Sequence, residues 1–212
     1  MPPPFSSYKA WAIKLRQSIR GNPHPMGETA PYIAPRLRRT VVLIGMMGAG
    51  KTAVGRALAS RLGVAIRDSD AEIESRSGLS IEEIFSRYGE GFFREKEAQV
   101  IARLVEGDPA ILSTGGGAWL DPGTRATLTG AAVVVWLNAD IDLLWQRVKH
   151  KDTRPLLRSE NPRATLESIH DARVPVYALA PHVVEVDPGW SIEDTTEAVL
   201  AVLQDAGAVE PA

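Results

Sequence analysis

Short apolar runs recur along the chain, and most are followed by a stretch with helical spacing of its apolar residues. The runs lie at residues 40–44, 64–67, 110–112, 132–137 and 182–186. Such runs, rich in β-branched and aliphatic residues, are typical of strands that are covered on both faces. Strands that alternate with helices form parallel sheets through right-handed crossovers. The pattern therefore predicts an α/β fold, with one five-stranded parallel sheet and helices on both of its faces.

The expected helices fill the intervals between these strands. They cover residues 51–62, 71–77, 81–88 and 92–106, a short helix opened by Asp121 and Pro122, and residues 140–149, 162–179 and 191–203. Ser80 and Glu83 form a capping box, which predicts a helix start. Residues 89–91 read Gly-Glu-Gly, so we expect a break there. A kink is expected at Pro175.

Between the first strand and the first helix the chain reads Gly45-Met46-Met47-Gly48-Ala49-Gly50-Lys51-Thr52. This is the pattern G-x-x-x-x-G-K-T of a phosphate-binding loop. Glycines let backbone N–H groups approach phosphate oxygens, and the helix N-terminus favours an anion. Lys51 would reach the β- and γ-phosphates, and the Thr52 hydroxyl would bind Mg²⁺. A chance glycine-rich turn is the alternative, but the strand before it and the amphipathic helix after it favour a nucleotide site.

Two further polar features follow predicted strands. Asp68 and Asp70 lie two positions apart, so on an extended chain both carboxylates would face one site. Residues 115–117 are three glycines, which favour backbone held against a ligand over a simple tight turn. Because ligands gather at the carboxyl ends of parallel strands, we expect both features to share a cleft with the phosphate loop. Asp70 is placed to orient or deprotonate an acceptor hydroxyl.

Composition and charge narrow the class of protein. The 212 residues are 44% hydrophobic, enough for one core, and we expect one domain over residues 40–206 with a tail at 207–212. Residues 1–39 hold seven Lys and Arg against one Glu, a charge of +6, which leaves −8 for the rest. An acidic body argues against nucleic-acid binding, and no apolar run is long enough to span a membrane. The lack of cysteine excludes disulfides and suits a reducing cytoplasm.

The first 39 residues are rich in proline and in basic residues. Only residues 8–19 show a helical pattern there. We expect a poorly ordered extension, with a membrane-surface or targeting segment as the alternative, and the short pattern does not decide between them. Lys9, Lys14 and Arg16 interrupt what would be the apolar part of a secretory signal.

The ordered set of motifs resembles the shikimate kinase family from about Thr40 to Leu203. The matching pieces are GMMGAGKT at 45–52, DSD at 68–70, GLSIEEIF at 78–85, GEGFFR at 89–94, TGGG at 114–117, RPLL at 154–157 and RVPVY at 173–177. Many enzymes share the phosphate loop, whereas the whole set is specific. The resemblance implies a three-layer P-loop kinase fold with a mobile lid at about residues 150–163. It also implies transfer of the ATP γ-phosphoryl group to the 3-hydroxyl of shikimate, in aromatic amino acid biosynthesis, and we expect a cytoplasmic monomer.

The resemblance further implies roles for the residues that match its motifs. ATP would be bound by Gly48, Ala49, Gly50, Lys51, Thr52, Ala53, Arg147 and Arg154. Shikimate would be bound by Asp70, Phe93, Arg94, Gly115, Gly116, Gly117 and Arg173. Catalysis would depend on Lys51, on Asp70 as base or orienting group, and on Arg154 from the lid. Mg²⁺ would be held by Thr52 and, through water, by Asp68.

Arg94 and Arg173 would hold the substrate carboxylate, because the donor fork of a guanidinium matches a carboxylate and keeps its charge at neutral pH. Trp190 stands in the loop where members of the family often carry a basic residue near the adenine. It could stack on the base, although we favour a buried hydrophobic anchor. For Trp119, just past the glycines, we favour core packing over a place in the acceptor pocket.

Two other functions stay open at this point. The first is another small-molecule kinase, acting on gluconate or a nucleoside monophosphate; the paired arginines and the glycine triplet favour a carboxylated polyol instead. The second is a non-catalytic nucleotide-binding regulatory module. That alternative predicts loss of phosphoryl-transfer residues, and all of them are present.

Overall fold

The computed structural model describes residues 36–150 and 159–210. The expected N-terminal extension lies outside the described residues up to position 35. The central part of the expected lid also lies outside them, and so does Arg154. Within the described ranges, no helix is long and apolar enough to cross a membrane.

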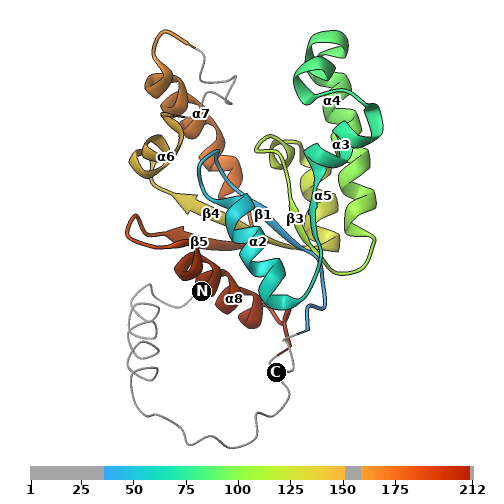
Figure 1. Ribbon diagram of the computed structural model, residues 1–212, viewed down its shortest axis with the longest axis vertical. Helices are drawn as coiled ribbons and strands as arrows, with labels where there is room; N and C mark the ends of the chain where they lie inside the picture. The colour runs from blue at the N-terminus through green and yellow to red at the C-terminus, as the bar shows by residue number, and fades with distance from the viewer. Residues whose placement is uncertain (1–35, 151–158, 211–212) are drawn as a thin grey trace, which may run out of the picture. The chain divides into compact units, whose positions relative to one another are not determined.

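Five strands form one parallel sheet in the order β2-β3-β1-β4-β5 (Figure 1). They are β1 (Val41–Ile44), β2 (Ile66–Asp68), β3 (Ile111–Ser113), β4 (Val133–Ala139) and β5 (His182–Val186). Val42 of the central strand pairs with Leu112 on one side and with Val134 on the other. Every side chain of β1 is buried, which explains its uninterrupted apolar run. The predicted five-stranded parallel sheet is confirmed.

The helices cover both faces of this sheet, as the right-handed crossovers require. They are α2 (Lys51–Leu62), α3 (Ser69–Ser77), α4 (Ile81–Val105), the short 3₁₀ helix η1 (Ala118–Leu120), α5 (Pro122–Ala131), α6 (Ile141–Val148), α7 (Pro162–Tyr177) and α8 (Ile192–Asp205). Helices α2 and α8 pack together on one face, and α5 lies on the other (Figure 1). A small apolar cluster of Ile73, Ile84 and Phe93 joins α3 to α4, apart from the main core.

The break expected at residues 89–91 is confirmed in α4, where it is confined to one residue. Only Gly89 leaves the helical conformation, with φ 81° and ψ 170°, a region that favours glycine. Glu90 and Gly91 already belong to the segment that continues to Val105. One consequence matters for the site: Glu90, Arg94 and Glu97 lie three and four positions apart on one helical face.

The described part of the domain extends beyond the boundaries expected at residues 40 and 206. Leu37 forms an antiparallel bridge with Val209 and is buried. The Arg38 amide donates to the carbonyl of Ala208 at 2.9 Å, which ties the two ends of the domain together. Residues 36–39 and 207–210 therefore belong to the folded domain.

Leu37→Ala is expected to lower the free energy of unfolding by about 2–5 kcal/mol, because it leaves a cavity beneath this bridge. The matched control is Arg38→Ala: its exposed pair with Glu210 should contribute about 1 kcal/mol or less. Urea unfolding of both variants compares the two. Equal losses would show that residues 36–39 contribute only a surface contact.

Candidate active site

A cavity of about 1220 Å³ lies at the carboxyl edge of the sheet. Its wall is formed by the turns after β1 and β3, the end of β2 and parts of α2, α3, α4, α6, α7 and α8. The residues expected at the site that line it are Gly48, Ala49, Gly50, Lys51, Thr52, Ala53, Asp68, Asp70, Phe93, Arg94, Gly115, Gly116, Gly117, Arg147 and Arg173. Arg154 lies outside the described residues. The structure thus brings the other expected residues together, while their individual roles stay predictions.

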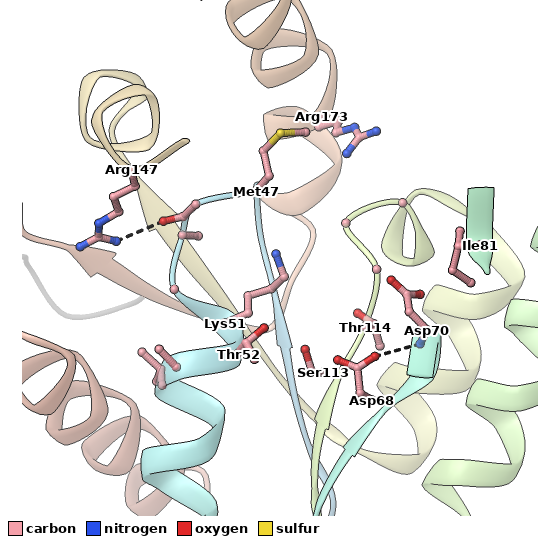
Figure 2. Close-up of a pocket in the computed structure, with 18 of the residues that line it drawn as sticks. Met47, Lys51, Thr52, Asp68, Asp70, Ile81, Ser113, Thr114, Arg147 and Arg173 are labelled. Carbon is pink, nitrogen blue, oxygen red and sulfur yellow. Dashed lines mark hydrogen bonds between the residues drawn. The ribbon is translucent and has the colours of Figure 1, made fainter. Parts of the chain in front are cut away.

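The turn after β1 leads directly into α2. Gly50 precedes the helix with φ 100° and makes no side-chain cap, and Gly50, Lys51 and Thr52 at this end of the helix all line the cavity. The Lys51 ammonium donates to the carbonyl of Gly45 at 2.8 Å and of Met46 at 3.0 Å. Figure 2 shows Lys51 reaching from the start of α2 toward the space between this turn and Asp70. This arrangement suits an anion with several oxygens.

Asp68 and Asp70 both line the cavity, but Asp70 does not lie on the strand as the sequence predicted. Asp68 ends β2 and caps α3, accepting from the amides of Asp70 at 3.0 Å and Ala71 at 3.1 Å (Figure 2). Asp70 therefore lies in the first turn of a helix, not two positions along an extended strand. The argument from strand alternation was wrong, although both side chains do line the cavity. The reason is that Asp68 is itself an N-cap residue, which starts the helix one residue later.

The side chain of Asp70 is half-buried, and one of its carboxyl oxygens is fully buried. Its Oδ1 atom has no hydrogen-bond partner within the described residues. Burial raises the pKa of Asp70, and the neighbouring carboxylates of Asp68 and Glu74 raise it further, whereas Arg94 and Lys51 lower it. A carboxylate with an unused oxygen and increased proton affinity is suited to accept a proton from a ligand hydroxyl.

Arg94 lines the same cavity and is held by two glutamates. Its Nη1 donates to the buried Glu97 at 2.7 Å, and its Nη2 to the exposed Glu90 at 3.2 Å. Its guanidinium carbon lies 5.1 Å from the ring centre of Phe93. Burial raises the pKa of Glu97, while its bond to Arg94 acts in the other direction. The guanidinium is therefore oriented before any ligand arrives, which reduces the ordering cost of binding.

The glycine turn after β3 lies close to Asp70 and to the pair of Arg94 and Glu97. A side chain at Gly115 would place its Cβ 3.0 Å from Glu97 Oε1 and 3.2 Å from Asp70 Oδ1. At Gly117 it would collide with the guanidinium of Arg94. The groups that approach this turn closely are the protein's own charged side chains, and contact of the turn with a ligand stays a prediction. Because glycine has no side chain, the backbone of residues 115–117 itself forms part of the cavity wall.

Sequence reasoning did not identify Glu97. The signal was present, since Glu97 lies three residues after Arg94, a spacing that pairs side chains on a helix. Glu97, however, packs against the glycine turn, which is distant in the sequence and which no local pattern brings to it. Thr195 and Ile192 of α8, which line the cavity, were also not identified.

The far end of the cavity is formed by α6 and the segment before α8. Arg147 donates from Nη1 to the carbonyl of Gly48 at 3.3 Å, and burial lowers its pKa (Figure 2). Trp190 packs partly against the core and also lines the cavity. Trp119 is different: it is buried, and its indole N–H donates to the carbonyl of Val176 at 2.9 Å. Core packing is confirmed for Trp119, whereas for Trp190 the stacking on an adenine base stays a prediction.

A metal site would have to be built from few protein ligands. Among residues 36–150 and 159–210, no three His, Cys, Asp or Glu side chains gather as a metal cluster. Thr52, Asp68 and Ser113 line the same cavity, and Asp68 pairs with Ser113 across the sheet (Figure 2). Hydroxyl and carboxylate oxygens are hard ligands, and Mg²⁺ at phosphate sites takes only one or two protein ligands. The residues present fit Mg²⁺ bound together with a nucleotide.

Solved structures show the same fold. A shikimate kinase from Acinetobacter baumannii in complex with shikimate is 36% identical, with a TM-score of 0.74 over 79% of this chain and 94% of that one. A gluconokinase from Sinorhizobium meliloti is 17% identical, with a TM-score of 0.54 over 81% of this chain and 94% of that one. At that identity the second likeness shows the fold alone.

Sequence comparison is more specific. The shikimate kinase family model matches residues 47–204. The shikimate kinase of Ruegeria pomeroyi is 56% identical over 180 residues, which are 85% of this chain and 92% of the relative. That of Cereibacter sphaeroides is 53% identical over 184 residues, 87% and 90% of the two chains. This chain belongs to the shikimate kinase family.

Proposed function

We propose that this protein transfers the γ-phosphoryl group of ATP to the 3-hydroxyl of shikimate, which gives ADP and shikimate 3-phosphate. One observation carries the proposal most directly. The phosphate-binding turn opens into the same cavity as two guanidiniums and a half-buried carboxylate with an unused oxygen. A small carboxylated polyol matches that set of groups, and family membership supports the choice of shikimate.

ATP is assigned to the side of the cavity formed by α2, α6 and the start of α8. The backbone of residues 48–53 would surround its phosphates, with Lys51 on the β- and γ-phosphates. Arg147 and Trp190 would lie against the adenine. The Thr52 hydroxyl would hold Mg²⁺, with Asp68 holding one of its waters. Bound there, Mg²⁺ would neutralise charge on the β- and γ-phosphate oxygens.

Shikimate is assigned to the side formed by α3, α4, α7 and the glycine turn. Arg94 and Arg173 would hold its carboxylate, and Phe93 would lie against its ring. N–H groups of residues 115–117 would bind its hydroxyls. This places the 3-hydroxyl beside Asp70, between the ring and the phosphate-binding turn.

In the reaction, the 3-hydroxyl oxygen forms a bond to the γ-phosphorus while the bond from that phosphorus to the β,γ-bridging oxygen breaks. ADP leaves, and the hydroxyl proton passes to Asp70. Lys51 stabilises the charge that develops on the phosphoryl oxygens, and Arg154 is proposed to do so from the lid. Exclusion of water by the lid would prevent hydrolysis of ATP.

We further propose that the enzyme acts in the cytoplasm as a monomer, with ATP and shikimate as its small-molecule partners. Two features support this proposal. The chain has no cysteine, and the residues assigned to both substrates belong to one chain. Residues 1–35 are assigned no part in the reaction.

The proposed function is tested by ADP release from purified protein with ATP and Mg²⁺ and one of four acceptor conditions: shikimate, gluconate, a nucleoside monophosphate or none. We expect turnover with shikimate alone. Turnover with another acceptor would contradict the substrate assignment but retain the kinase machinery. Binding of ATP without turnover on any acceptor would support the regulatory module instead.

Arg94→Ala is expected to raise the KM for shikimate about 10–100-fold, because it removes charge-assisted hydrogen bonds to the carboxylate. The KM for ATP should stay within about twofold, since the nucleotide lies on the other side of the cavity. Arg87→Ala is the matched control, because Arg87 lies on the same helix and pairs with Glu83 at 3.2 Å outside the cavity. Equal effects on both substrates would contradict the division of the cavity.

A further inference from the structure

The C-terminal end of α7 is joined to the glycine turn and to η1, which follows that turn, by two hydrogen bonds that the proposed function does not use. The hydroxyl of Tyr177, the last residue of α7, donates to the carbonyl of Gly116 at 2.6 Å. In the other direction, the indole of Trp119 donates to the carbonyl of Val176 at 2.9 Å. Tyr177 has no exposed surface, and its ring stacks on Trp136 with centroids 6.1 Å apart.

The bond to Tyr177 selects one orientation of the peptide between Gly116 and Gly117. Glycine permits most backbone conformations, so neither residue sets that orientation through its own side chain. A trans peptide is planar, and its C=O and N–H point in opposite directions. With the Gly116 carbonyl held toward the core by Tyr177, the Gly117 N–H is turned away from Tyr177, and Gly117 lines the cavity.

Tyr177 is also linked to Arg173 through the helix that both share. The two residues are four positions apart, so they lie on the same face of α7. The position that a Cβ of Gly116 would take is 3.3 Å from Arg173 Nη1 and 3.5 Å from the Tyr177 hydroxyl, so both groups face the same glycine. Burial raises the pKa of Tyr177, more than Arg173 and Arg94 lower it, which keeps the hydroxyl protonated as a donor.

We propose that Tyr177 is a positioning residue for the acceptor. Through its bond to Gly116 it sets the direction of the Gly117 N–H and the distance between that N–H and the guanidinium of Arg173. The acceptor would then meet a backbone donor and a guanidinium that are already at the right separation. The inference rests on the proposed function, since the acceptor is taken to be shikimate. Tyr177 itself does not touch the acceptor, and the competing account is that its ring only fills the core against Trp136.

Tyr177→Phe separates these accounts, because it removes the hydroxyl and retains the ring stacked on Trp136. The expected result is a rise of about tenfold in the KM for shikimate, the size of one lost buried hydrogen bond, with the KM for ATP within about twofold. The fall in kcat should be smaller than the rise in KM. A residue that only fills the core would lower the melting temperature and leave both KM values unchanged.

Thr196→Val serves as the matched control. Thr196 is fully buried, and its hydroxyl donates to the carbonyl of Ile192 at 2.8 Å in α8, on the face of the sheet opposite α5. Valine removes that hydroxyl at nearly constant volume. The melting temperature should therefore fall by about as much as in Tyr177→Phe, without a change in the KM for shikimate. If both variants lose stability equally and neither changes that KM, the proposal is overturned.

A measurement on the unmodified protein supplements the variants. The Gly117 amide should exchange rapidly with deuterated solvent in the free protein and become protected when shikimate is added. Protection already present without shikimate would show that this N–H is bonded internally, against the proposal. Wild-type protein that fails to phosphorylate shikimate would overturn the proposed function, whereas unchanged kinetics of Tyr177→Phe beside an active wild type would overturn only the positioning role.

Discussion

Asp70→Asn is expected to lower kcat about 10²–10⁴-fold, with KM values for ATP and shikimate within a few-fold of wild type. Asparagine retains the shape of the side chain and an oxygen for the hydroxyl, but it cannot take the proton. In the unmodified enzyme the same dependence appears in pH profiles: kcat/KM should fall as the pH drops through the raised pKa of Asp70. That acidic limb should be absent from the residual activity of the variant.

The same substitution is expected to make the protein more stable at pH 7. Burial is the main cause of the raised pKa of Asp70, so its carboxylate form is disfavoured in the folded state. A group whose pKa is higher in the folded state stabilises the fold while it is protonated. That contribution is lost as the pH rises from the unfolded value, about 4, through the folded one. Asparagine cannot ionise, so the gain in melting temperature should be present at pH 7 and vanish near pH 3.

Asp171→Asn is the control for both measurements, because Asp171 is an exposed aspartate of α7 outside the cavity. It should change neither kcat nor the pH dependence of the melting temperature. Activity of Asp70→Asn within tenfold of wild type would remove Asp70 from the proton-transfer step. A lower melting temperature at pH 7 would contradict the account of its burial.

Lys51→Ala is expected to lower kcat by a similar factor, about 10²–10⁴-fold, and to weaken ATP binding as well. The ammonium now donates to two carbonyls of the turn after β1, which places it at the entrance of the phosphate site. Removing it takes away the positive charge that would stabilise the transferring phosphoryl group. Steady-state kinetics and titration with a fluorescent nucleotide measure the two effects separately.

Lys96→Ala is a suitable control, since Lys96 is an exposed lysine of α4 that does not line the cavity. Circular dichroism of both variants checks that the fold is retained. If Lys51→Ala kept kcat within about tenfold of wild type, the turn after β1 would bind phosphate without taking part in its transfer.

The sheet could be predicted from the sequence because its central strands are covered on both faces. Complete burial of β1 requires an uninterrupted apolar run, and such a run is visible in one dimension. The phosphate-binding turn was visible for a similar reason, since its glycines and Lys51 are adjacent in the chain. Both predictions were good because the residues that determine each feature are neighbours in the sequence.

Two features were missed because distant residues decide the outcome. Residues 36–39 join the domain through residues 207–210, with Arg38 and Glu210 172 positions apart. The Tyr177 hydroxyl meets a carbonyl 61 residues away, so the sequence indicated no role for it. Asp70 was placed on a strand because the capping function of Asp68 was overlooked, and that capping was in principle readable.

The measurement that tests the central claim most directly follows the γ-phosphoryl group itself. Wild-type protein would be incubated with ATP carrying an isotopic label in the γ-phosphate, Mg²⁺ and shikimate, and the product examined by phosphorus and proton NMR. We predict that the label appears in a phosphate ester on carbon 3 of shikimate, with one ADP formed for each ester. Label found in inorganic phosphate or on another hydroxyl would contradict the proposed placement of the acceptor beside Asp70.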